Sequence, residues 1–318
     1  MSSIPDPIFK KNLSEISWSK IYEREYGVQY SEAAVKLLAT ESYHFPKTST
    51  AQIVIPGTAY NTTFYIDSKS WIELVEGLHK KYTSNVKNLE KYEKQFLFDG
   101  ENYLKFGKRI SKINLKNLSN KKLLSLFLIH QKKRNRYSVF AWSAFILNNY
   151  ISDKASKILD SYIARYNKEN EKQEIYDSLF VPEKRAAVLE LQYQVQKKKG
   201  KLTSLEFNKL YDQFKWFSCL DIHNKPWSKN EFKEHIKPLA SSSPKKVIHF
   251  KKIIQQLKFT KKNLEYLFMA KLFVYIKDAR DDFRREGVFY SQSLFNEIGK
   301  RINIDPLDST YLQEYERF

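Results

Sequence analysis

The chain has 318 residues, of which 42% are hydrophobic and 29% are charged, and its formal net charge is +19. This length and composition are typical of a folded protein that buries roughly three quarters of the surface exposed by its unfolded chain. With only 8 glycines and 9 prolines, the sequence lacks the glycine-rich turns that a large parallel sheet needs. We therefore predict a mainly α protein.

A single cysteine, Cys219, excludes an internal disulfide and any cysteine-based zinc site. The first residues, MSSIPDPIFKKNL, contain neither a long apolar core nor a small-residue cleavage pattern. No stretch reaches the roughly 20 apolar residues of a membrane span. These features predict a cytoplasmic protein with no metal site and no contact with a membrane.

In chain order, residues up to about 47 are expected to form helix and loop. A small β-hairpin follows, because Gln52–Ile55 and Tyr60–Asp67 alternate β-branched and aromatic residues around Pro56 and Gly57. Ser70 is expected to cap a helix, and a helical pattern resumes after it. The predicted fold class is a mainly α, multi-helix domain with a small β-hairpin near residues 52–67.

The stretch 112–120 is the best candidate for an internal hinge. It divides the chain into an N-terminal helical part with the hairpin, residues 1–112, and a C-terminal helical part, residues 113–318. We expect the two parts to pack together as one continuous unit. Further helices are predicted over residues 123–151, 155–167 and 183–199, the last ended by Gly200. Residues 168–174 are predicted to be a charged connector, and residues 238–244 a flexible linker.

The clearest helical pattern lies near the C-terminus, where apolar residues recur at spacings of three and four from Leu264 to Phe283. Basic residues share another face of this helix. After Gly287 a second amphipathic stretch runs to Arg301, so a helix pair is expected over residues 263–301. We expect the arginines of its first helix to face outward.

The order of these C-terminal features resembles the end of the helical region in PEP-utilising phosphotransferases, a group that includes PEP synthase (pyruvate, water dikinase) and rifampin phosphotransferase. In that family an Arg-rich helix, a helix ending in a basic pair and a D-x-x-D-x-x-Y-L-like turn precede the phosphohistidine domain. The corresponding turn here begins at Asp305 and ends at Leu312. Residues 18–26, WSKIYEREY, look like the opening of the family's helical domain. Segments 65–71, 113–124 and 214–227 resemble later parts of that domain, in the same order.

The resemblance implies a non-catalytic helical module that contributes substrate binding or docking. The ATP-grasp unit and the phosphohistidine loop of the family are not recognisable, and none of the six histidines lies in a glycine-rich context. We therefore predict no catalytic residue and no cofactor bound by this chain. ATP and Mg²⁺ are implied only for a partner, a phosphohistidine-domain or ATP-grasp protein encoded nearby.

Four basic residues are candidates for contact with a phosphate or with a phosphohistidine domain, since guanidinium groups one helical turn apart can hold an anion from one side. They are Lys277, Arg280, Arg284 and Arg285. The alternative is a solvated helix whose own carboxylates neutralise these charges.

A second group of candidates lies in the aromatic segment 214–227. Trp216, Asp221, His223 and Trp227 would line an apolar pocket for a small-molecule substrate, or they belong to an ordinary core. Cys219 is expected to be a buried apolar residue.

His130 precedes a run of basic residues that would lower its pKa if those charges lie close in space. A solvated basic turn of a helix explains the same run. The alternative function is a basic helical protein that binds nucleic acid or an acidic protein partner. Because most of the 55 basic residues are lysine, as an AT-rich genome also produces, we expect nucleic-acid binding to be weak and nonspecific at most.

Overall fold

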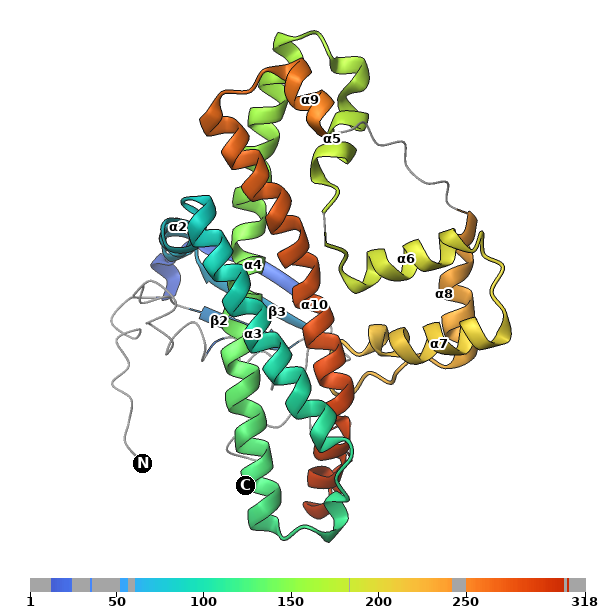
Figure 1. The fold of residues 1–318 in the computed structure, drawn as a ribbon. Helices are drawn as coiled ribbons and strands as arrows, with labels where there is room; N and C mark the ends of the chain where they lie inside the picture. The colour runs from blue at the N-terminus through green and yellow to red at the C-terminus, as the bar shows by residue number, and fades with distance from the viewer. Residues whose placement is uncertain are drawn as a thin grey trace.

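The computed structural model describes residues 13–24, 35, 52–56, 61–182, 184–241, 250–305 and 308. Within them the fold is mainly α with a small antiparallel sheet, which confirms the fold class expected from the sequence. Three long helices run through the molecule (Figure 1). They are α3 (Val86–Ile110), α4 (Asn120–Arg165) and α10 (Lys261–Arg301).

Each long helix begins at a polar cap. The side chain of Asn85 accepts a hydrogen bond from the backbone N–H of Asn88 at 2.9 Å, and that of Thr260 accepts one from Asn263 at 3.3 Å. Ser119 caps α4 in the same way. These side chains satisfy backbone amides that the first helical turn leaves without a partner.

The helix α4 continues through the point where a break was expected between residues 151 and 155. Ile151 and Ala155 are both buried and lie one turn apart, so they share the face that packs on the core. The polar residues between them lie on the exposed side of the same turn. The expectation of two separate helices is wrong because the buried stripe is continuous.

The helix α10 likewise continues through Gly287, where the expected helix pair was divided. A Cβ atom at Gly287 would lie 2.0 Å from Cε1 of Tyr103, and one at Gly100 would lie 2.7 Å from the ring of Phe283. Only glycine allows such an approach of a ring to a helix backbone. Close packing against α3 therefore keeps α10 helical at a residue that weakens isolated helices.

A three-stranded antiparallel sheet consists of β1 (Trp18–Arg24), β2 (Gln52–Pro56) and β3 (Thr62–Asp67), with β3 in the centre. The pairing of β2 with β3 is the hairpin expected near residues 52–67. The expectation of helix and loop up to residue 47 is wrong at β1. Its aromatic and β-branched residues favour a strand, and Tyr22 stacks on Phe64 of β3 with 5.3 Å between ring centroids.

The helix α2 (Ser68–Leu78) follows β3 directly and leads through a single π-helical turn, His79–Thr83, into α3. Its cap is Asp67, which accepts hydrogen bonds from the backbone of Lys69 at 3.3 Å and from the hydroxyl of Ser70 at 2.8 Å. Ser70 thus supports the cap from inside the helix and is not itself the cap.

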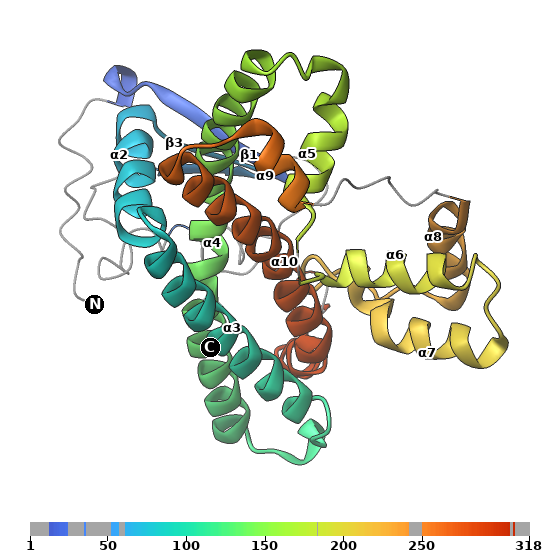
Figure 2. The same ribbon diagram turned by 45° about the horizontal axis from the view of Figure 1, so that its top comes forward.

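Two short helices, α5 (Lys172–Phe180) and α9 (Phe250–Leu257), pack where α4 ends and α10 begins (Figure 2). The expected charged connector is wrong in part, because α5 begins within it at Lys172 and a short 3-10 helix, Glu169–Glu171, precedes it. Buried aliphatic side chains from α4, α5 and α9 hold this end together.

The α6–α8 unit, residues 187–241, stands to one side of the long helices (Figures 1 and 2). It contains α6 (Ala187–Lys197), α7 (Ser204–Phe214) and α8 (Lys229–Ser241). Gly200, at φ +72°, follows the end of α6 as expected. Pro238 lies inside α8, so the expected linker is helical where it begins, and residues 242–249 lie outside the described part.

Side chains of α10 attach the α6–α8 unit to the long helices. Asp282 accepts a hydrogen bond from the backbone N–H of Ala187 at 2.7 Å. A side chain of α10 thus caps the first turn of α6. Arg285 donates to the carbonyl oxygen of Phe217, and Gln292 donates to that of Ile222 at 3.3 Å. The orientation of the unit therefore depends on α10.

The chain reverses between α3 and α4 through a short 3-10 helix, Leu115–Asn117, inside the stretch expected to be a hinge. The side chain of Arg301 donates to Asn120 at 2.7 Å and to the carbonyl oxygen of Leu115 at 3.0 Å, so the end of α10 holds this turn. The division at residue 112 stays a prediction. Of the expected turn at residues 305–312, only Asp305 and Asp308 lie among the described residues.

Candidate functional site

A cavity lies between α4, α10 and the edge strand β1, and we call it the outer cavity. Its volume is about 50 Å³, and three arginines from two of these elements face it. The lining residues are Tyr22, Arg24, Ala141, Trp142, Phe145, Arg280, Asp281 and Arg284. Because Asp281 is the one carboxylate among them, the lining carries an excess of positive charge.

Arg280 brings a guanidinium group to the outer cavity that its surroundings do not fully satisfy. Its Cζ lies 5.3 Å from the ring centroid of Phe145, in a cation–π arrangement. Its Nε is buried and has no hydrogen-bond partner in the described part of the chain. A buried donor without a partner costs stability and is uncommon in folded proteins, so Arg280 makes this cavity a candidate binding site.

Arg284, one turn further along α10, turns inward. Its side chain is 12% exposed, and its Nη2 lies 3.1 Å from Oδ1 of Asp281. The expectation that this arginine faces outward is wrong, because α10 packs on α3 with one side and on α4 with another. Arg280 is half-buried on the same side.

A second cavity, which we call the inner cavity, lies deeper between α3, α4, α10 and the loop that follows residue 218. Its volume is about 40 Å³. It shares Ala141, Trp142 and Arg284 with the outer cavity, so the two are adjacent. Its other polar lining residues are Tyr103, His130, Arg134, Tyr137, Ser138, Asp221 and Ser291.

His130 is the most buried titratable group of the inner cavity, with 1% of its surface exposed. Burial, together with the nearby charge of Arg134, lowers the pKa of His130 to about 3, so the ring is neutral at pH 7. The sequence suggested the effect of the basic run on His130, and the structure shows that burial is the larger cause. The rings of Tyr103 and Phe295 each lie 5.5 Å from the imidazole centroid.

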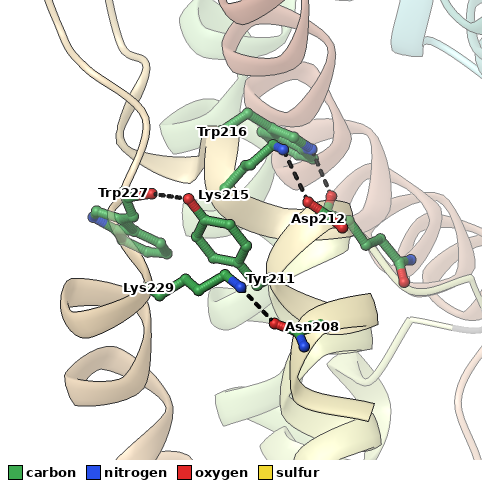
Figure 3. A network of polar contacts seen from close by, with 8 residues as sticks. Asn208, Tyr211, Asp212, Lys215, Trp216, Trp227 and Lys229 are labelled. Atoms are coloured by element: carbon green, nitrogen blue, oxygen red, sulfur yellow. Dashed lines mark hydrogen bonds and ion pairs between the residues drawn. The ribbon is translucent and has the colours of Figure 1, made fainter. Parts of the chain in front are cut away.

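The aromatic segment 214–227 does not form one pocket. Trp216 and Trp227 pack in the core of the α6–α8 unit, whereas Asp221 is buried at the inner cavity. Figure 3 shows the backbone contacts that hold the two tryptophans: Trp216 Nε1 donates to the carbonyl oxygen of Gln213 at 2.7 Å, and Tyr211 donates to that of Trp227 at 3.0 Å. His223 is half-buried and does not line either cavity.

The remaining basic candidates lie away from both cavities. Lys277 is half-buried, and its Nζ lies 3.6 Å from Oδ1 of Asp278. Arg285 is held by the backbone of Phe217. Cys219 is fully buried, and burial raises the pKa of its thiol to about 12, which makes it an unreactive core residue at neutral pH.

No group of three or more His, Cys, Asp and Glu side chains among the described residues could hold a metal ion. No helix in that part of the chain has the length and apolar character needed to cross a membrane.

No protein-family model, curated protein or solved structure matches this chain. The resemblance to PEP-utilising phosphotransferases therefore stays a prediction from the sequence.

Sequence reasoning missed Arg24, Arg134 and the aromatic residues of the outer cavity. Arg24 lies on a strand that the sequence did not predict, and nothing in its neighbourhood signals a contact with α10. Arg134 is visible in the sequence only as part of the basic run that follows His130. One signal in the sequence could have indicated the site. An arginine beside the apolar stripe of a helix, as at Arg284, indicates a charged side chain that is turned toward the protein interior.

Proposed function

We propose that this chain is a non-catalytic helical module of a PEP-utilising phosphotransferase system and that its outer cavity binds the anionic group of a small-molecule substrate. The observation that carries the proposal is the buried Nε of Arg280, which has no hydrogen-bond partner among the described residues. Two further arginines, Arg24 and Arg284, face the same cavity.

Electrostatics supports an anion. Three guanidinium groups repel one another, and the single carboxylate of Asp281 offsets only part of that repulsion. A phosphate or carboxylate would accept hydrogen bonds from several of these planar groups at once, which is the geometry that arginine provides and lysine does not. The aromatic walls exclude water and strengthen such bonds.

The size of the cavity limits the ligand. Pockets for drug-sized molecules usually have volumes of roughly 300–1,000 Å³. The outer cavity, at about 50 Å³, accommodates a compact group such as a phosphate and not a nucleotide or a macrocycle. The proposal is therefore restricted to small anionic substrates.

The phosphotransferase context rests on the sequence resemblance, since the order of the family's landmarks is preserved along most of the chain. In this view the ATP-grasp and phosphohistidine domains, with ATP and Mg²⁺, belong to another chain encoded nearby. That chain would carry out the phosphoryl transfer, and the present module would hold the substrate.

Calorimetric titration with inorganic phosphate and, separately, with phosphoenolpyruvate tests the anion site. The variant Arg280→Met keeps the bulk of the side chain and its contact with Phe145 but removes the guanidinium. We expect it to weaken binding at least about tenfold, which corresponds to about 1.4 kcal/mol. Lys277→Met is the matched control, because it removes the same charge from a position of the same helix that lines neither cavity.

Equal affinity of wild type and Arg280→Met for both anions would overturn the anion site, as would absence of binding by the wild type. Tight binding of a DNA duplex that Arg280→Met leaves unchanged would favour the alternative of a nucleic-acid-binding protein. A neighbouring reading frame with a phosphohistidine domain would support the phosphotransferase context, and titration of its product against this chain would test the association.

A further inference from the structure

His130 is a buried polar side chain that has no hydrogen-bond partner among the described residues. Neither Nδ1 nor Nε2 forms a hydrogen bond with any part of the described chain, and both atoms are buried. A buried imidazole in an ordinary core normally makes at least one hydrogen bond. Because His130 lines the inner cavity, a group that occupies this cavity can supply what the ring lacks.

The protonation state of His130 determines what that group must be. Since the ring is neutral at pH 7, one nitrogen donates a hydrogen bond and the other accepts one. A hydroxyl group matches either nitrogen, because it can both donate and accept. A second anionic group is disfavoured in the inner cavity, because the ring of His130 is uncharged and the carboxylate of Asp221 lines the same cavity.

The inner cavity lies beside the outer cavity. Ala141, Trp142 and Arg284 line both, so a ligand group held by Arg284 in the outer cavity lies next to the inner one. Tyr103 of α3, which packs on Gly287, lines the inner cavity, and its ring centroid lies 5.5 Å from that of His130. The arginines and the imidazole therefore line adjacent cavities.

The charges of the combined lining favour a dianion. The arginines are Arg24, Arg134, Arg280 and Arg284, and the carboxylates are Asp221 and Asp281. Four positive and two negative groups leave an excess of two positive charges. A phosphate monoester carries about −1.5 to −2 at pH 7, whereas a monocarboxylate carries −1, so the phosphate balances the site better.

We propose, building on the proposed function, that the two cavities are one binding site for a small phosphate monoester with a hydroxyl group. The phosphate lies among the guanidinium groups of Arg24, Arg280 and Arg284, and the hydroxyl hydrogen-bonds to His130. This assignment names the substrate class of the module as a short phosphorylated hydroxy compound.

Glycerol 3-phosphate and propyl phosphate are suitable probes, because they have the same chain length and differ in their hydroxyl groups. Calorimetric titration of the wild type should show at least about tenfold tighter binding of glycerol 3-phosphate, the ratio that one buried hydrogen bond provides. In His130→Phe the two probes should bind within about twofold of each other. The ring of phenylalanine suits the aromatic surroundings, and His235→Phe, on the α6–α8 unit, is the matched control.

A second measurement does not depend on the folding of a variant. In protein labelled with ¹⁵N at histidine, glycerol 3-phosphate should shift the ring nitrogen signals of one buried histidine, and propyl phosphate should shift them much less. A site filled only by water predicts no difference between the two probes. The spectrum of His130→Phe assigns the signal.

The outcomes distinguish the anion site of the outer cavity from the hydroxyl contact at His130. If the wild type binds both probes equally and His130→Phe changes neither affinity, the inner cavity takes no ligand group and this inference is overturned, while the anion site stands. If the wild type binds neither probe nor inorganic phosphate, the anion site fails as well.

Discussion

Where α10 packs on α3, the rings of Tyr103 and Phe283 lie directly on glycine backbone, whereas on its side toward α4 it borders two cavities lined by arginines, the outer one reaching β1 and the inner one reaching Tyr103 of α3. Both faces belong to one uninterrupted helix. We call the side of α10 that packs on α3 around Gly287 the close face, and the side that borders the cavities around Arg280 the polar face. The close face stabilises the fold by contact and by exclusion of water. On the side toward α4, Nε of Arg280 and the ring nitrogens of His130 are buried without a hydrogen-bond partner among the described residues, which costs stability.

The largest effect is expected on the close face. Gly287→Ala should lower the free energy of unfolding by about 2 kcal/mol, because the new Cβ would collide with the ring of Tyr103 at 2.0 Å. Urea denaturation measures the change. Gly107→Ala is the control on α3, since its Cβ would lie 3.1 Å from Cβ of Tyr290 and alanine favours the helix. Equal destabilisation by both would show that the close face is not specially tight at Gly287.

A second prediction concerns Asp282, which lies on the side of α10 that faces α6. Burial raises the pKa of Asp282 to about 7, from an ordinary value of 3.8, so the folded state holds this proton more tightly than the unfolded chain does. Its contribution to stability is complete below pH 4 and is lost as the pH rises through 7.

Asp282→Asn keeps an acceptor for the N–H of Ala187 without this titration. From pH 5 to pH 8 the variant should gain about 2–3 kcal/mol of stability relative to the wild type, as measured by denaturation at each pH. Asp212→Asn, at an exposed ion pair, should show a constant difference over the same range. A constant difference for Asp282→Asn would contradict the buried, protonated carboxyl.

The smallest effect on stability is expected on the polar face. Arg280→Met should change the free energy of unfolding by less than about 1 kcal/mol, or raise it, because the substitution removes a buried donor without a partner and keeps an apolar contact with Phe145. Thermal denaturation without added anion measures this. A loss of 3 kcal/mol or more would assign Arg280 to the structural core, as is usual when a buried paired charge is removed.

The sequence predicted the parts of this fold that depend on local pattern. The spacing of apolar residues located α3, α4 and α10, and alternation located the β2–β3 hairpin. The strand β1 was missed because its partner β3 lies far along the chain, and strand pairing is decided by contacts that a local window does not contain. The breaks expected in α4 and α10 were wrong because tertiary packing maintained helices that local signals would end.

The candidate site was predicted only in part. Arg280 and Arg284 were chosen from their spacing on one helix, which is local information. Their burial depends on β1 and α4, so the expected outward orientation of Arg284 could not be corrected from the sequence. Asp221 was chosen for its aromatic neighbours, yet it lies at the inner cavity, because the loop that carries it is held by Gln292 of α10.

The position of α10 in the chain also affects how the protein forms during synthesis. The ribosome completes α3 and α4 long before α10, which packs on both, because the end of α10 follows Arg165 by most of the C-terminal half of the chain. At about 5–20 residues per second, the delay is on the order of ten seconds. During that interval residues such as Phe96 and Tyr137 lack the helix that covers them, so the nascent chain exposes apolar surface that the finished protein buries.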